Sequence, residues 1–176
     1  MPKKYRKMLT DWQAPYIEPI LRLIETQSKA TIANWCIDYA ELHLLPIYRA
    51  AHPSDARPAL AIDAARRWLA GEIKLPEAKK SILNCHAAAR EIDDNPAALA
   101  AARAVGQCTA TIHAPTHSAG LMFYGALALA YHKIGVDADW DELLKVAEQE
   151  CNKMHEALEK VAIKDETNPA KINWNC

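Results

Sequence analysis

The segment ATIHAPTHSAG, residues 110–120, holds the side chains with the clearest capacity for chemistry. His113 and His117 stand four residues apart, a spacing at which two histidines on one helix share a face and can bind zinc. Pro115 lies between them, and a proline interrupts a helix because it lacks a backbone N–H. We therefore predict that the two histidines lie on either side of a turn that leads into the next helix.

Two other roles fit such a turn. Thr116 or His117 could cap the following helix, or the backbone N–H groups at its start could hold an anion or polar ligand. A metal would need a third ligand from far away, because no Asp or Glu occurs within ten residues before His113 or fifteen after His117. The candidates for that ligand are Asp38, Glu41 and His86. We expect helix capping here, and we predict no metal site and no cofactor.

Asp38 and Glu41 lie one helical turn apart and could act as paired carboxylates in acid–base chemistry. Together with His113 and His117 they would form the site of a small-ligand protein or a metal-dependent enzyme. A plainer interpretation is a solvated helix face, or an ion pair with a neighbouring arginine. We favour this plainer interpretation.

A basic cluster occurs in the next predicted helix, residues 54–71, and consists of Arg57, Arg66 and Arg67. Trp68 stands on the same helix, so an anionic ligand is conceivable. Asp55 and Asp63 neutralise much of this positive charge, and Asp63 lies at the spacing of a helical ion pair with Arg66 or Arg67. We expect this cluster to form local ion pairs.

The five cysteines are odd in number, widely scattered and free of any C-x-x-C pair: Cys36, Cys85, Cys108, Cys151 and Cys176. This pattern predicts reduced thiols in a cytoplasmic protein, not a disulfide framework. Cys85 precedes His86 directly, but neighbours on a helix point about 100° apart, so adjacency does not make a nucleophile–base pair.

The elements that must position these residues are all helices. The chain has 176 residues, rich in alanine, with only 5 glycines and 1 phenylalanine, which favours helix over strand. Prolines mark several helix starts. We predict one all-α domain over residues 1–176, with about seven helices at about 16–26, 28–51 with a kink at Pro46, 54–71, 76–92, 96–113, 116–133 and 140–164.

The last two predicted helices differ in pattern. The Ala/Gly-rich helix 116–133 is apolar nearly all round, which predicts the central, most buried element. The amphipathic helix 140–164 carries a heptad seam, formed by Trp140, Leu144, Ala147, Cys151, Met154, Leu158 and Val161. This seam packs inside the bundle or forms a homodimer. The outer positions carry Glu142, Glu148, Glu150, Glu156 and Glu159, an acidic face that could meet a basic partner.

The overall charge gives no general attraction to nucleic acid or to anionic membranes. There are 21 basic and 22 acidic residues, for a formal net charge of -1. The longest near-apolar run, AGLMFYGALALAY, is shorter than the roughly 20 residues that span a bilayer. We therefore expect neither nucleic acid nor membrane as a partner.

Three segments together resemble a family of small, all-helical bacterial immunity proteins, the immunity-five-like domain of polymorphic toxin systems. They are NWCIDYAELHLLPIY (34–48), DARPALAIDAARRWLAGE (55–72) and AAARAVGQCTATIHAPTHSAGLMFYGALALAY (100–131). The resemblance implies a cytoplasmic protein that binds and neutralises a cognate toxin. It supplies no catalytic residues, and the positions that match its pattern without a known role are Asp55, Arg57, Trp68 and His113. Our leading hypothesis is therefore an immunity protein without catalysis.

Overall fold

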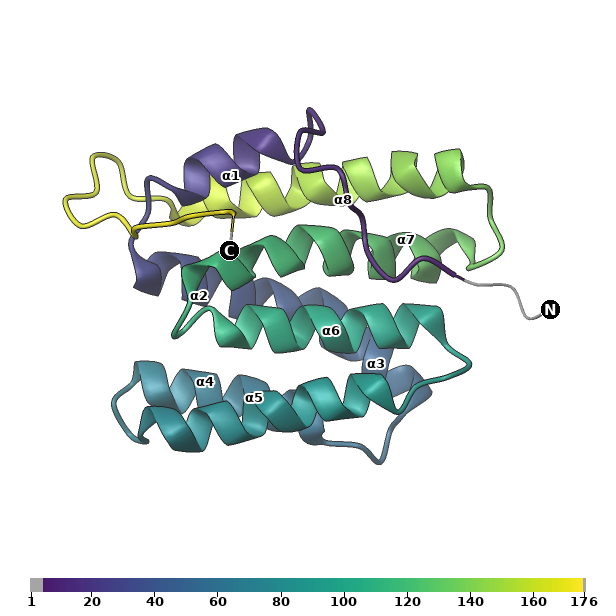
Figure 1. The fold of residues 1–176 in the computed structure, drawn as a ribbon, viewed down its shortest axis with the longest axis horizontal. Helices are drawn as coiled ribbons and strands as arrows, with labels where there is room; N and C mark the ends of the chain where they lie inside the picture. Colours follow the sequence, from purple (N-terminus) through teal and green to yellow (C-terminus); the bar gives the residue numbers. More distant parts are fainter. Residues whose placement is uncertain (1–4, 176) are drawn as a thin grey trace.

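The chain folds into helices that lie side by side along one long axis (Figure 1). The computed structural model describes residues 5–175, and no strand occurs in that range. The elements are α1 (Glu18–Ile24), α2 (Lys29–Tyr39), the π-helical turn η1 (Ala40–Leu44), α3 (Leu45–Ala51), α4 (Arg57–Leu69), α5 (Leu75–Arg90), α6 (Pro96–Ala110), the 3₁₀ turn η2 (Pro115–Ser118), the π-helical turn η3 (Leu121–Ala126), α7 (Leu127–Ile134) and α8 (Trp140–Val161). Because α2 continues through η1 into α3, and η3 into α7, the described residues form seven helical rods, which confirms the predicted all-α bundle.

The rods form layers around α6 and the η3–α7 rod. Figure 1 shows α1 and α8 on one side, α4 and α5 on the other, and α7 and α6 between them. Residues 119–131 are all buried except the half-buried Tyr124, which confirms the predicted central helix. α6 shares this central position, because it packs against α3, α4, α5, α7 and η3. Small alanine side chains let so many helices approach it closely.

Local capping signals set the ends of the helices. The Ser28 Oγ accepts a hydrogen bond from the Thr31 N–H at 3.2 Å at the start of α2. Asn95 Oδ1 accepts one from the Ala98 N–H at 2.9 Å at the start of α6. Gly71 and Gly135, which follow α4 and α7, have φ angles of 77° and 88°, a left-handed region that glycine adopts without strain.

The kink predicted at Pro46 takes the form of the π turn η1. Pro46 has no N–H to donate to the carbonyl of Leu42, and just before it the Leu45 N–H bonds to the Ala40 carbonyl, one residue farther back than in an α-helix. This wider turn shifts the buried face by one residue. The helical spacing of Ile32, Cys36 and Tyr39 predicts His43 on the apolar side, but His43 is exposed here, and Leu44 is fully buried.

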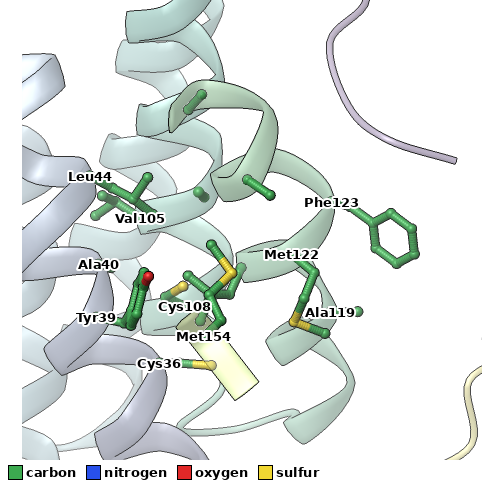
Figure 2. Close-up of a cluster of buried hydrophobic side chains, with 14 of the residues drawn as sticks. Cys36, Tyr39, Ala40, Leu44, Val105, Cys108, Ala119, Met122, Phe123 and Met154 are labelled. Atoms are coloured by element: carbon green, nitrogen blue, oxygen red, sulfur yellow. The ribbon is translucent and has the colours of Figure 1, made fainter. Parts of the chain in front are cut away.

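The core forms where five elements meet. In Figure 2, Cys36 of α2, Leu44 of η1, Cys108 of α6, Met122 of η3 and Met154 of α8 gather in one cluster, and all five are fully buried. The heptad seam of α8 belongs to this interior, because its four central residues are inaccessible within the single chain: Ala147, Cys151, Met154 and Leu158. The seam therefore packs inside the bundle.

Two predicted burial assignments were wrong. Glu150, expected on the outer face of α8, is only 3% exposed, because Lys133 from the end of α7 reaches over it and binds its carboxylate. Lys153 binds the same carboxylate oxygen at 3.0 Å. The helical spacing of Leu60, Ala61, Ala64 and Ala65 predicts a buried stripe on α4, but Leu60 is 55% exposed. Ile62 is buried instead. The buried face of α4 is thus rotated relative to the predicted one.

Candidate functional site

The histidine pair lies at the elbow between α6 and η2, as Pro115 predicts. α6 ends at Ala110, and η2 begins at Pro115, so His113 precedes the second element and His117 lies within it. Their ring centroids are 5.6 Å apart, with the planes inclined at 62°. The capping expectation was wrong, because no side chain caps the first turn of η2. The Nδ1–H of His117 instead donates to Gln107 Oε1 at 2.7 Å.

A third histidine joins the pair from α5. The imidazole of His86 lies flat against Gly106 of α6, so closely that a Cβ placed on this glycine would lie 2.5 Å from the ring carbon Cε1. Gly120, just before η3, likewise leaves room for the side chain of Gln107 of α6. The two glycines allow three helices to converge, and they bring His86 to the elbow. We call His86, His113 and His117, together with Arg103 and Lys79, the histidine surface.

Electrostatics favour neutral histidines at the histidine surface. Burial lowers the pKa of all three imidazoles, and it lowers the pKa of His86 to about 4 with the help of the positive charges of Arg103, His117 and Arg90. Lys79 and His117 act in the same direction on the pKa of His113. The charged groups that shift the pKa values of His86 and His113 are all positive.

The histidine surface also contains polar atoms without partners. The Nδ1 atoms of His86 and His113 are buried and make no hydrogen bond within the described part of the chain. The Oγ of Ser118, in the same elbow, is a third such atom. Unbonded buried polar atoms are uncommon in folded proteins and ask for an explanation. The histidine surface is therefore incompletely bonded.

A second polar cluster, at the start of α4, is fully bonded. Asp55 accepts hydrogen bonds from the Tyr48 hydroxyl at 2.6 Å and from the backbone N–H and guanidinium of Arg57 at 2.7 to 3.1 Å. The other edge of the same guanidinium binds Glu91 through two hydrogen bonds of 2.9 and 2.6 Å. We call Tyr48, Asp55, Arg57 and Glu91 the clamp, because they tie α3, α4 and the end of α5 together.

The hydrogen bonds within the clamp shift the pKa values of its members. Hydrogen bonds from Arg57 lower the pKa of the Asp55 carboxyl, and the Glu91 and Asp55 carboxylates raise the pKa of Arg57. Burial and the hydrogen bond to Asp55 raise the pKa of Tyr48. All five N–H groups of a guanidinium can donate, and here both edges are occupied by carboxylates. Asp55 and Arg57, two positions that match the family pattern, thus have a structural role.

The other predicted site residues lie apart from the histidines. Arg66 of α4 binds Asp38 at 2.9 Å and also Glu41, so the carboxylate pair forms the ion pair that we favoured. Trp68 is half-buried and packs against the core. Arg67 lies 3.9 Å from Asp63, the helical pair predicted from spacing. These carboxylates are therefore directed to arginines and not to the histidine elbow.

Metal and thiol chemistry receive no support from the side chains that the structure describes. No group of three or more His, Cys, Asp or Glu residues within positions 5–175 is arranged to hold a metal ion. Cys36, Cys85, Cys108 and Cys151 are free and buried, whereas Cys176 lies outside the described residues. The Cys85 thiol donates to the Ala102 carbonyl at 3.4 Å and not to the neighbouring His86. Burial raises the pKa of Cys85 to about 12, which disfavours the nucleophilic thiolate.

Sequence reasoning missed several residues that shape these sites. Tyr48 and Glu91 in the clamp, and Gln107 and Arg103 beside the histidines, were not among the candidates. One signal was present, because a glycine inside the alanine-rich α6 indicates a close approach by a neighbouring side chain. It does not say which side chain approaches.

The fold and these clusters define an all-helical bundle within residues 5–175. No helix within residues 5–175 combines the length and apolar character that crossing a membrane requires. The family model described as Imm-5 like putative immunity protein matches residues 22–157, from α1 to near the end of α8. The chain belongs to this family. Neither the curated proteins nor the solved structures compared with it include a significant match.

Proposed function

We propose that this protein is an immunity protein of a bacterial toxin system, which binds its cognate toxin in the cytoplasm and neutralises it without catalysis. The observation that carries the proposal is the family match, which covers nearly the whole helical bundle. Four buried, free cysteines agree with a reducing compartment. The rival enzyme site at His113 and His117 lacks its expected carboxylates, because Arg66 binds both Asp38 and Glu41.

The exposed face of α8 is the toxin-binding surface in this proposal. It carries five exposed carboxylates: Asp141, Glu142, Glu148, Glu156 and Glu159. Lys145 and Lys160 are the exposed cations against them, since Lys153 is engaged by the buried Glu150. The opposite face of α8 is locked in the core, so these carboxylates sit on a rigid helix. A preorganised acidic face suits a basic surface on the toxin, because little is lost in ordering it.

A homodimer through the heptad seam is not part of this proposal. Cys151 and Met154 are fully buried against other elements of their own chain, so a second copy could reach them only if the bundle opened. The acidic face is on the other side of the same helix and remains available to a partner.

The experiment mixes the purified protein with the toxin-like protein encoded beside its gene. We expect one complex in gel filtration, and protection of cells that express the toxin. The double variant Glu148→Lys, Glu159→Lys should weaken binding at least about tenfold at low salt, mainly through slower association. Asp93→Lys, which makes the same kind of charge change in the exposed loop after α5, should bind normally.

The outcomes separate the function from the surface. Absence of both complex and protection with the unchanged protein would contradict the proposed function. A complex that tolerates the α8 double variant as well as it tolerates Asp93→Lys would place the interface elsewhere and contradict the acidic-face proposal alone.

A further inference from the structure

We propose that the histidine surface binds a small oxyanion, the phosphate or carboxylate group of a soluble ligand. This proposal goes beyond toxin neutralisation and does not depend on it, because the residues lie on α5, α6 and the elbow instead of α8. Three observations carry it: an unpaired arginine, three converging imidazoles, and a glycine that holds one of them in place.

Arg103 differs from the other half-buried arginines. Arg57 and Arg66 are also half-buried, and each is bound by two carboxylates. Arg103 has no carboxylate within ion-pair distance among the residues that the structure describes, although the chain carries 22 acidic residues. A guanidinium held partly out of water is well suited to bind an oxyanion through two parallel hydrogen bonds.

The imidazoles supply further donors around this cation. His86 lies close enough to Arg103 and His117 for their charges to lower its pKa, and His113 stands in ring contact with His117. The buried Nδ1 atoms of His86 and His113 have no partner, so the opposite ring edge, Nε2, is the one that can meet a ligand. Side chains of α5, α6 and the elbow thus lie near one another at this surface.

Gly106 shows that this arrangement depends on close packing. Any larger residue there would displace the ring of His86, since a Cβ would lie within 3 Å of Cε1, Nδ1 and Nε2. The ring is consequently held beside α6, next to the side that carries Arg103 and Gln107. An anion is favoured over a cation here, because the arginine and lysine charges that lower the pKa values of His86 and His113 are those of Lys79, Arg90 and Arg103.

Anion binding at this surface should take up protons. The Nδ1–H of His117 donates to Gln107, so the Nε2 of the neutral ring is an acceptor, and it becomes a donor to an anion only on protonation. The facing groups are Lys79 and Arg90 of α5, Arg103 of α6, and the histidines themselves. A bound anion offsets their positive charge and raises the histidine pKa values, so affinity should rise as the pH falls from 7.5 to 6.

The test follows the histidine ring signals of the full chain by NMR during titration with inorganic phosphate and, separately, succinate. Chloride is adjusted to keep the ionic strength constant. We expect saturable shifts of His86, His113 and His117 with at least one of the two anions, several-fold tighter at pH 6 than at pH 7.5. The exposed His132 and the peripheral His155 serve as internal references.

Matched variants make the result specific. Arg103→Gln should weaken anion binding about tenfold, whereas Arg49→Gln, at an exposed arginine that is also without an ion pair, should leave it unchanged. Denaturant unfolding of each variant confirms that it is folded. Shifts that do not saturate, or that fall equally in both variants, indicate an adventitious ion only and overturn the proposal. Binding of a polyglutamate peptide with no response to either small anion would also overturn it, in favour of a protein contact.

Discussion

The clamp and the histidine surface each contain a half-buried arginine among polar side chains, but they differ in how completely these groups bind one another. In the clamp, Asp55 and Arg57 exchange hydrogen bonds with each other, and Tyr48 and Glu91 complete the set. At the histidine surface, two imidazoles keep an unbonded buried nitrogen, and Arg103 has no carboxylate partner within residues 5–175.

This difference separates a structural role from a binding role. A cluster whose charged groups bind one another has few donors left for a ligand, and removal of one member leaves its charged partners without theirs. An incompletely bonded cluster contributes little to the fold, but it retains donors that a ligand can use. Substitutions in the clamp should therefore affect mainly stability, and substitutions at the histidine surface mainly ligand binding.

The largest effect is expected for Asp55→Ala. The variant removes the acceptor for Tyr48 and for Arg57, and it leaves part of a guanidinium without its partner. We expect the free energy of unfolding to fall by about 3 kcal/mol, measured by urea denaturation. Asp63→Ala is the control, because its carboxylate is exposed and lies 3.9 Å from Arg67, so it should change stability by less than about 0.5 kcal/mol. Equal losses in both variants would show that the clamp has no special role.

The next largest effect is expected in the pH dependence of stability, because His86 and Asp55 should alter the free energy of unfolding in different pH ranges. The pKa of His86 is about 4 in the folded protein and about 6.5 in an unfolded chain, so the unfolded state binds a proton first as the pH falls. The free energy of unfolding should therefore drop by about 2 kcal/mol between pH 7 and pH 4.5. Asp55 has a lowered folded pKa, so the stability that it contributes is present above about pH 4 and is lost only below it.

The variant His86→Leu isolates this contribution. Its stability should depend less on pH between 7 and 4.5 than that of the unchanged protein, while the loss below pH 4 remains. Urea denaturation at four pH values measures both windows. An unchanged pH dependence in His86→Leu would mean that this ring is not held neutral by its surroundings.

The sequence predicted the bundle because its signals are local. Prolines near the starts of α5 and α6, and glycines after α4 and α7, act within a single turn of helix, so seven rods could be counted without tertiary information. The errors arose where one element alters another. The π turn before Pro46 moved His43 to the surface, and Lys133 from α7 covered Glu150 of α8.

Only part of the candidate site could be predicted from the sequence, for the same reason. Spacing identified His113 and His117, and Pro115 placed them at an elbow. The approach of His86 depends on how α5 packs against Gly106, and the pairing of Asp38 and Glu41 with Arg66 depends on how α4 meets α2. No periodic pattern or motif in the sequence predicts either of these contacts.

A smaller effect is expected for Gly106→Ala. Alanine favours the helix by about 1 kcal/mol over glycine, but the new methyl group must displace the ring of His86. These effects oppose each other, so stability should change by less than about 1 kcal/mol, while the NMR signal of His86 moves and the anion response weakens. In a His86→Ala background the same change should be stabilising, since the obstruction is gone. A similar loss of stability in both backgrounds would contradict the contact.

The smallest effect on stability is expected for His113→Leu, and it tests the comparison most directly. The ring contributes an unbonded buried nitrogen, and its replacement by an apolar side chain of similar size removes that cost without breaking any hydrogen bond of the fold. The free energy of unfolding should stay within about 0.5 kcal/mol of the unchanged protein or rise slightly. Anion binding should nevertheless be lost. If His113→Leu instead destabilised the protein as strongly as Asp55→Ala does, the ring would be a structural element like the clamp and not part of a binding site.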